Sequence, residues 1–338
     1  MVAAGVRPVL AGRDQDRLNA LAARLSRVGD GIELETAVAG IESPEPLRRL
    51  LGVGDVLVST AGPFMKVGRP AVAAAVDAGA VLLTAFGYDY VPGNLAGALA
   101  LQAAGPAVSR VLVGYFVRGN IRKGTSAGTR ASVAGVLLEP GYAFRGGRVV
   151  SERTAARVAS FEVGGRQRRA FSIGSSEHFA LPRLRPGAAA DGVPVRAPLT
   201  EVGVYLGWFG AATSLVHYAS SLAVPLGRLP AVHRVLEQQA RRIQRSRAAP
   251  GAEEAIRSDV VAMAGEANGG TLAVVHLTGG DPYSFTAPML AWAAGRAAAQ
   301  GVRPSGALGP VEAFGLGSLE SACADAGFHR ERPRSASR

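Results

Sequence analysis

The sequence predicts an α/β fold in which a doubly wound parallel sheet is followed by a second α+β domain of mixed sheet. Apolar runs that suit buried strands alternate with helical patterns over the first 84 residues. These strand runs are continuously apolar, as expected of parallel strands covered on both faces. From about residue 109, strand-like segments follow one another and helices stand apart. We therefore predict two domains in this 338-residue chain.

The N-terminal elements come in a regular order. Strands are expected over 6–11, 32–38, 55–60 and 80–84, and helices over 14–27 (with Asp14 as N-cap), 44–51 and 69–78. Ligands of a doubly wound sheet bind beyond the carboxyl ends of its strands. We therefore expect a site at the loops 11–14, 60–68 and 84–94.

The second half has a different pattern. We expect a strand over 110–117, strand pairs within 148–172 with a turn at 163–165, and a strand over 202–209. A hairpin of 257–264 with 271–278 is expected around a turn at 268–270, and helices are expected over 129–138, 230–247 and 284–300. The predicted domains are 1–108, Rossmann-like and NADP-binding, and 109–303, substrate-binding. Residues 304–328 are a candidate return to the first domain, and 329–338 are expected to be a disordered tail.

Composition excludes several function classes. The net charge of +11 comes mostly from arginine, but zinc-finger spacing and basic-aromatic strand pairs are absent, so we expect no nucleic acid partner. The five histidines are scattered, which predicts no metal site. The single cysteine, Cys323, and the lack of a signal-peptide pattern predict a cytoplasmic protein.

The segment 10–18 (LAGRDQDRL) contains the candidate cofactor residues Gly12, Arg13 and Asp14. The second strand of a doubly wound fold ends beside the adenosine ribose, where an arginine favours the 2′-phosphate of NADP and an acidic residue favours NAD. Arg13 therefore predicts NADP, with NAD as the less favoured cofactor. The alternative is a solvent-exposed arginine near a helix start.

A small-residue turn follows the strand at 55–60. Thr60, Ala61, Gly62, Pro63 and Phe64 are candidate cofactor contacts, because small residues let the backbone approach a ligand closely. The functional interpretation is a wall beside the nicotinamide ribose. An ordinary strand-to-helix turn is the alternative.

The segment 84–101 leads from a strand through a Gly/Pro loop into a small-residue helix. Tyr88 and Asp89 are candidate substrate-binding residues, and Tyr90 is a candidate proton donor. All three could equally serve packing and capping.

These segments together resemble the saccharopine dehydrogenase-like oxidoreductases, including the trans-acting enoyl reductase-like proteins. RPVLAGRD, DVLVSTAGPF, GRPAVAAAVDAGA and DYVPGNLAGALAL resemble the nucleotide-binding half of that family. GTSAGTRASVAGVLLEP, GSSEHFALPR, DPYSFTAPMLAWA and GALGPVEAFGL resemble its substrate half. The resemblance implies an NAD(P)H-dependent reductase that acts on a C=C, C=O or C=N bond of a small or acyl-chain substrate.

The family pattern also places a strand, a glycine loop and most of a helix before RPVLAGRD. Only Met1 to Val6 come before that segment here, with Met1 to Gly5 in the place of the helix. We therefore expect an N-terminally truncated fold that lacks its first strand, with roughly 20 residues absent and a misassigned start codon as the simplest cause. The glycine loop cradles the cofactor pyrophosphate at a helix N-terminus, so cofactor binding by this chain is in doubt.

Candidate residues for chemistry occur in the second half as well. His178, in a polar Ser-Glu-His run, and Tyr283 join Tyr90 as possible proton donors. Thr125, Ser126 and Arg130 lie in a Gly/Ser/Thr loop that suits an anionic group of a substrate.

Other functions stay open at this level. Gly124–Gly128 matches the serine-hydrolase pentapeptide around Ser126, with Asp259 and His276 in a permissible order. A second alternative is a non-catalytic or lipid-associated protein that keeps the fold without the cofactor. Residues 202–247 join an uncharged segment to a cationic helix and could contact a membrane peripherally, or form a core helix beside a solvated one. The oligomeric state is undetermined.

Overall fold

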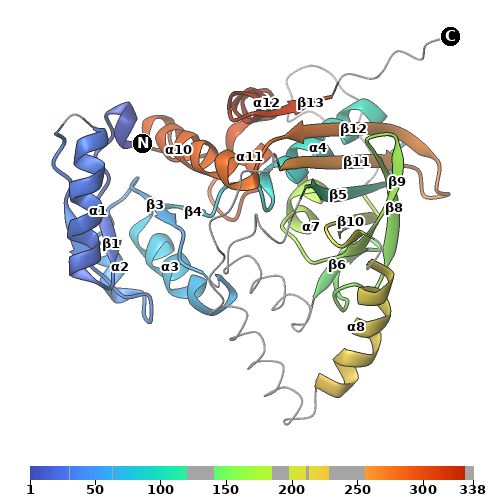
Figure 1. Cartoon of the computed structure of the whole chain (residues 1–338), viewed down its shortest axis with the longest axis horizontal. Helices are drawn as coiled ribbons and strands as arrows, with labels where there is room; N and C mark the ends of the chain where they lie inside the picture. The colour runs from blue at the N-terminus through green and yellow to red at the C-terminus, as the bar shows by residue number, and fades with distance from the viewer. Residues whose placement is uncertain are drawn as a thin grey trace. The chain divides into compact units, whose positions relative to one another are not determined.

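The computed structural model describes residues 1–29, 31–62, 64–119, 141–184, 198–210, 213–227 and 256–331 (Figure 1). The chain divides into two compact units. One consists of Met1–Phe86 with Thr286–Arg303, and the other of Gly87–Phe285 with Pro304–Arg338. Parallel strand pairs joined by helices, followed by a mixed sheet, confirm the predicted fold class.

The first unit alternates strands and helices in the predicted order. Its elements are η1 (Val2–Ala4), β1 (Leu10–Gly12), α1 (Gln15–Val28), β2 (Thr36–Val38), α2 (Glu45–Arg48), β3 (Val56–Ser59), α3 (Phe64–Ala78), β4 (Val81–Thr84) and most of α10 (Pro282–Gln300). Asp14 caps α1 as predicted, because its side chain accepts a hydrogen bond from the Arg17 backbone N–H.

The strands of the first unit form two separate parallel pairs in the described part of the chain. Leu10 of β1 lies opposite Thr36 of β2, and Ser59 of β3 lies opposite Thr84 of β4. The first strand is shorter than the predicted 6–11. Val9, just before it, is 51% exposed, so its apolar side chain has little to pack against.

The core of the first unit is small. Ala39, Leu47, Ala71 and Ala74 are buried together between the segments around α2 and α3. In α1, Leu18 is the buried residue of the predicted apolar face. The first unit thus has the predicted apolar side chains, but only some of them are buried.

The second unit contains most of the remaining elements. These are α4 (Val91–Ala104), β5 (Arg110–Arg118), β6 (Tyr142–Arg145), β7 (Arg148–Ser151), β8 (Val158–Val163), β9 (Arg166–Ser172), α7 (Glu177–Ala180), η2 (Leu181–Arg183), β10 (Glu201–Leu206), α8 (Thr213–Gly227), β11 (Arg257–Gly265), β12 (Thr271–Gly279), α11 (Pro310–Phe314), α12 (Leu316–Asp325) and β13 (Phe328–Arg330).

Nine of these strands form one mixed sheet. Its order is β13-β12-β11-β5-β10-β6-β7, with β9 pairing to both β10 and β8. The β5–β10 pair is parallel, and the other pairs are antiparallel. The hairpins predicted around 163–165 and 268–270 are confirmed as β8–β9 and β11–β12.

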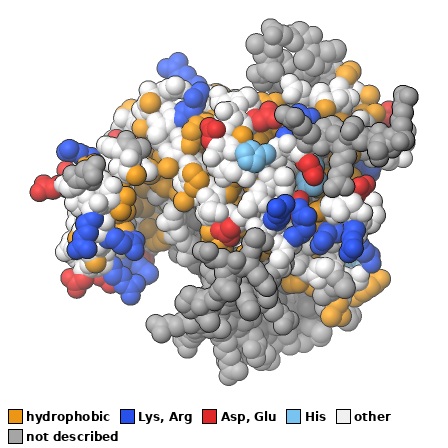
Figure 2. Space-filling view, turned by 45° about the horizontal axis from the view of Figure 1, so that its top comes forward, with side chains coloured by type: hydrophobic (Ala, Val, Ile, Leu, Met, Phe, Trp, Pro, Cys, Tyr) orange, Lys and Arg blue, Asp and Glu red, His pale blue; other side chains and the backbone are white. Residues whose placement is uncertain are grey.

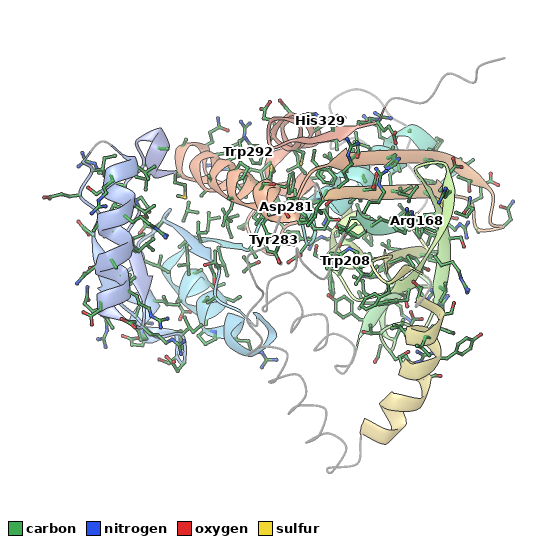
Figure 3. The ribbon with its side chains drawn as sticks, in the orientation of Figure 1. Arg168, Trp208, Asp281, Tyr283, Trp292 and His329 are labelled. Carbon is green, nitrogen blue, oxygen red and sulfur yellow. The ribbon has the colours of Figure 1, made fainter. Side chains whose placement is uncertain are left out.

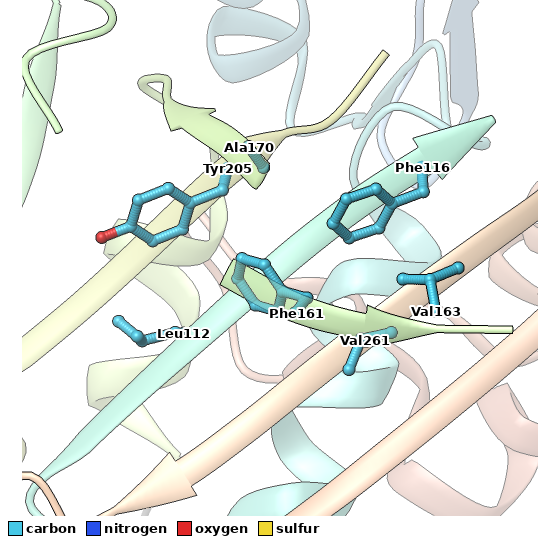
Figure 4. Packing of buried hydrophobic residues seen from close by; sticks show 7 residues of the cluster. All are labelled: Leu112, Phe116, Phe161, Val163, Ala170, Tyr205 and Val261. Atoms are coloured by element: carbon cyan, nitrogen blue, oxygen red, sulfur yellow. The ribbon is translucent and has the colours of Figure 1, made fainter. Parts of the chain in front are cut away.

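The two faces of this sheet are covered differently. Helix α4 packs along β5, β11 and β12, and every residue from Val91 to Leu101 is buried. Along β5, side chains alternate between this face and the opposite one. On the opposite face β8 and β9 fold back, and the core there consists of Leu112, Phe116, Phe161, Val163, Ala170, Tyr205 and Val261 (Figure 4).

The domain boundaries differ from the predicted ones. The division lies after Phe86 rather than at 108, because α4 packs against the second sheet. Residues 286–303 group with the first unit, whereas 304–328 belong to the second. The disordered tail was predicted to begin at residue 329, but residues 328–330 form β13, which pairs with β12. The Glu331 N–H also donates to the His276 carbonyl at 2.8 Å.

The uncharged segment 202–227 forms a strand followed by a helix, as predicted, in β10 and α8. Within the described ranges, no helix has both the length and the apolar character needed to cross a bilayer. Leu215 and Tyr218 of α8 are 70% and 66% exposed. The predicted helices at 129–138 and 230–247 lie outside the described residues.

Candidate functional site

The loop after β1 holds the residues predicted to recognise the adenosine ribose. Gly12 ends the strand, and a Cβ there would lie 3.3 Å from Leu18 Cδ2. Asp14 Oδ1 accepts from the Arg17 N–H at 3.1 Å, and its Oδ2 pairs with Arg17 Nε at 3.2 Å. The Asp14 carboxylate is thus engaged at the start of α1. Arg13 is exposed and able to meet an anionic ligand.

The loops after β3 and β4 lie side by side. Their strands end at the Ser59–Thr84 pair, and the Ala85 N–H donates to the Ser59 carbonyl at 3.0 Å. A Cβ on Gly62 would have no neighbour within 4 Å, so the space over this turn is open. Of the predicted wall, Thr60, Ala61 and Gly62 are described, Phe64 begins α3 with only its backbone described, and Pro63 lies outside the described residues.

In the second unit, polar groups gather at the first turn of α4. Tyr90 is its N-cap residue, and Asn94 Nδ2 donates to the Tyr90 carbonyl at 2.9 Å and to Ser176 Oγ at 3.2 Å. The turn 175–178 is therefore tied to the start of α4. Tyr88 is buried just before this turn, whereas Asp89 is exposed.

A buried carboxyl group occupies the centre of this cluster. Glu177 is 0% exposed, and Tyr115 of β5 donates its hydroxyl proton to Glu177 Oε1 at 2.5 Å. Ser175 donates to the other carboxyl oxygen, Oε2. A Cβ at Gly93 would collide with both the Tyr115 hydroxyl and the Glu177 carboxyl. Glycine at this position lets the pair lie directly on the α4 backbone.

Burial controls the protonation of this pair. It raises the pKa of Glu177 to about 7, although hydrogen bonds from Ser175 and Tyr115 act in the opposite direction. Burial and the neighbouring Glu177 also raise the pKa of Tyr115 well above its ordinary value. Glu177 is thus a carboxyl group that exchanges its proton near neutral pH, where catalytic acids and bases often titrate.

His178 lies next to this pair and is 1% exposed. Its Nδ1 lies 3.2 Å from the Ser175 backbone nitrogen, and Tyr142 packs edge-on against its ring. Burial lowers the pKa of His178, which favours the neutral imidazole. The structure therefore places this predicted proton donor in the interior, beside Glu177.

Tyr283 lies in the first turn of α10, which begins in the second unit (Figure 3). It is 45% exposed, and its backbone N–H donates to Asp281 Oδ2 at 3.0 Å. Phe285, two residues on, contacts Phe328, and Phe328 contacts Tyr88 with ring centroids 6.0 Å apart. Aromatic packing thus links the start of α10 to Tyr88, which lies three residues before α4.

The Asp259–His276 pair considered for a hydrolase does form. His276 Nε2 lies 2.9 Å from Asp259 Oδ1, but His276 Nδ1 lies 2.5 Å from Glu331 Oε2. Asp259 also accepts two hydrogen bonds from Arg118, at 2.6 and 2.8 Å. Since carboxylates hold both ring nitrogens, His276 has no nitrogen left to activate Ser126. This geometry argues against the hydrolase alternative.

Burial alone would raise the pKa of Asp259. Hydrogen bonds from His276 and Arg118 outweigh burial and lower it below its ordinary value. Asp259 is therefore held as a carboxylate, in contrast to Glu177.

The structure brings some predicted site residues together and leaves others apart. Asn94 joins the Tyr90 carbonyl to Ser176 and so brings the turn that holds His178 to the start of α4, although 88 residues separate Tyr90 from His178 in the chain. The loop residues of the first unit belong to a separate compact unit. Thr125, Ser126 and Arg130 lie outside the described residues.

Tyr115, Asn94 and Glu177 were not among the predicted site residues. Asn94 lies four residues after Tyr90, and Glu177 directly precedes His178. An acidic residue beside the polar pair Ser175–Ser176 was the signal that could have identified Glu177. Tyr115 gave no signal, because an aromatic residue in an apolar strand is ordinary.

Metal-ligand clusters and surface charge bear on the partners of this chain. Among the described residues, no group of three His, Cys, Asp or Glu side chains could hold a metal ion. On the face in Figure 2, basic side chains occur at several separate places, with acidic ones between them. The predictions about nucleic acid, membrane and oligomeric partners stay predictions.

Comparison with known proteins supports the fold. No family model matches this chain, and no curated protein matches it. The chain is similar to the apo saccharopine dehydrogenase (L-Glu forming) from Saccharomyces cerevisiae, with a TM-score of 0.52 and 11% identity over 98% of this chain and 95% of that chain. An oxidoreductase from Sinorhizobium meliloti gives a TM-score of 0.25 and 14% identity over 91% of this chain and 71% of that chain. The yeast enzyme and this chain thus share a fold.

Proposed function

We propose that this chain is an NADP(H)-dependent oxidoreductase of the saccharopine dehydrogenase-like kind. The fold shared with the yeast dehydrogenase over almost the full length of both chains carries the proposal. Because one fold can serve many reactions, the site residues must add support. That support comes from the open space over Gly62 in the turn after β3 and from titratable groups gathered at the start of α4.

The β1 loop favours NADP over NAD. Selection of NAD needs an acidic side chain that is available to the ribose 2′-OH. The Asp14 carboxylate is occupied with the α1 backbone and with Arg17. Exposed Arg13 suits a 2′-phosphate, to which a guanidinium can donate two hydrogen bonds.

We also propose that one further parallel strand completes the first unit. In a doubly wound sheet the parallel strands are continuous, whereas here β1–β2 and β3–β4 are separate pairs. A strand between β1 and β3 would join the pairs and cover Val9. The glycine loop that the family resemblance implies would follow this strand and hold the pyrophosphate.

The reaction would reduce a C=C, C=O or C=N bond of a small or acyl-chain substrate. The bound nicotinamide would supply the hydride. A protein group would then deliver a proton to the acceptor. Tyr283 is 45% exposed and Tyr90 partly exposed, so they suit direct contact with substrate better than buried His178 does.

Nicotinamide fluorescence during NADPH and NADH titrations tests the proposal. The 338-residue chain should be compared with a chain extended by the residues encoded in frame upstream. We expect the extended chain to bind NADPH more tightly than NADH. Arg13→Ala should weaken NADPH binding about tenfold, since a charge-assisted hydrogen bond contributes about 1.5 kcal/mol, and should leave NADH binding unchanged.

Arg24→Ala is the matched control, because Arg24 is an exposed arginine in the middle of α1. It should leave both affinities unchanged. Failure of both chains to bind either nucleotide would exclude the oxidoreductase proposal and favour a non-catalytic protein with this fold. An equal loss in Arg13→Ala and Arg24→Ala would refute the assignment of Arg13.

A further inference from the structure

Glu177 connects three elements of the second unit through one carboxyl group. It belongs to α7, receives the hydroxyl of Tyr115 from β5, and lies on the α4 backbone at Gly93. Ser175, two residues before it, holds the second carboxyl oxygen. Ser176 meanwhile accepts from Asn94 of α4. The 175–178 turn is therefore fastened to the first turn of α4 through two adjacent residues.

Among the described residues, the partners of this carboxyl group are hydroxyl groups rather than cations. Within the described ranges, no arginine, lysine or histidine forms an ion pair with Glu177, although eleven other close acid–base contacts occur there. The titratable and charged groups around it are Tyr115 on β5, Tyr142 on β6, His178 on α7, Tyr88 before α4, and Arg145 and Glu152, which act on His178.

Ionisation would therefore place a negative charge, without an ion-pair partner among the described residues, at a fully buried position. Hydrogen bonds from Tyr115, Ser175 and Ser176 and the positive end of α4 offset part of the cost. Burial without a cation is still unfavourable to the anion. The neutral acid avoids this cost, although one of the hydroxyl groups that donate to Glu177 must then turn and accept its proton. Burial thus favours the protonated form of Glu177, against the hydrogen bonds that the carboxyl group accepts.

We propose that Glu177 acts as a proton-controlled latch between the 175–178 turn and the first turn of α4. Protonated Glu177 keeps the two turns together, and loss of the proton loosens them. Tyr88 and Tyr90 lead directly into that turn of α4, so the latch governs how firmly the 84–94 loop is held. This inference is independent of the proposed cofactor and reaction.

The direction of the pH effect follows from the raised pKa. Folding favours the protonated form, so the contribution of Glu177 to stability is complete below its ordinary pKa of 4.5 and is lost as the pH rises through about 7. Relative to a neutral side chain, this should raise the unfolding equilibrium constant about 30-fold between pH 5.5 and 8. His178 acts in the opposite sense, because burial lowers its pKa.

Comparison of the wild type with Glu177→Gln isolates this contribution. Urea unfolding at several pH values should show the 30-fold change in the ratio of their unfolding constants. Hydrogen exchange should show a matching pH dependence in the amide protection of the first turn of α4. After correction for intrinsic rates, the Gly93–Leu95 amides should lose protection above pH 7 in the wild type and keep it in Glu177→Gln.

Two further variants make the test decisive. Glu162→Gln removes an exposed carboxylate on β8 and should follow the wild type. Tyr115→Phe removes a hydrogen bond that lowers the pKa of Glu177, so the loss of protection should move to higher pH. If Glu177→Gln does not fold, the pH profile of Tyr115→Phe still tests the proposal. The same pH profile in the wild type and Glu177→Gln, or an unmoved profile in Tyr115→Phe, would rule the latch out.

Discussion

The two units of this chain follow similar apolar patterns but bury them to different extents. In the described part of the second unit nine strands share one sheet, and Phe116 and Phe161 are wholly buried where its β8–β9 hairpin folds back. In the first unit the strands form two pairs, and α1 buries only Leu18 among its described residues. Regularly spaced apolar residues predict a helix or a strand. How far those residues are buried depends on how many other helices and strands pack against it. The second unit should therefore be the more stable one.

The largest effect should come from the core of the second unit. Phe161→Ala removes a ring that packs against Phe116 and Tyr205 at 5.5 and 5.7 Å between centroids, and should cost about 4 kcal/mol. Leu47→Ala in the first unit should cost about 2 kcal/mol, because its surroundings are small and can relax. Trp208 and Trp292 lie in different units (Figure 3).

Urea unfolding followed by fluorescence can separate these effects in the single-tryptophan variants Trp208→Phe and Trp292→Phe. Phe161→Ala should shift the transition seen by Trp208, and Leu47→Ala the one seen by Trp292. If each variant shifted both transitions equally, the units would unfold as one, and the contrast between them would be lost.

The second effect concerns a buried charge of the second unit. Asp259→Asn leaves Arg118 and His276 without their carboxylate partner. The variant should lose about 3 kcal/mol of unfolding free energy. This value is near the lower end for buried ion pairs, because the Arg118 side chain is a third exposed. The lowered pKa of Asp259 gives stability that is present above the ordinary pKa and lost as the pH falls through the lowered one. Its pH slope is thus opposite to that of Glu177.

Acid unfolding of the wild type and Asp259→Asn tests this prediction. The wild type should lose its advantage over the variant below about pH 4. Asp281→Asn is a control, since Asp281 caps the first turn of α10 near the surface. A constant difference between the wild type and Asp259→Asn across the acid range would contradict the assignment.

Much of the local structure could be predicted from the sequence. The turn residues at 163–165 and 268–270 predicted two hairpins, because glycine provides the backbone conformations that tight turns need. The Asp14 cap followed from its place before an apolar helical period. These features depend on residues that are close together in the chain.

The candidate site could be predicted only in part. His178 and Tyr90 were selected separately, but nothing in the sequence indicated that Asn94 would join their segments. The Tyr115–Glu177 contact spans 62 residues, and the pairing of β5 with β10 and β11 positions it. The domain boundary at Phe86 likewise depends on α4 packing against the second sheet. Long-range pairing leaves no local signal.

The smallest effect should come from the cap of α1 in the less covered unit. Asp14→Ala leaves the Arg17 N–H without its acceptor and should cost about 1 kcal/mol. Because α1 has few buried contacts, this loss should appear as faster hydrogen exchange in the first turn of α1, with the Trp208 transition unchanged. Asp16→Ala is the matched control: it removes a neighbouring exposed carboxylate that forms no cap. Equal exchange in the two variants would show that tertiary packing rather than the cap holds this helix, and that the first unit is better covered than its strand pairing indicates.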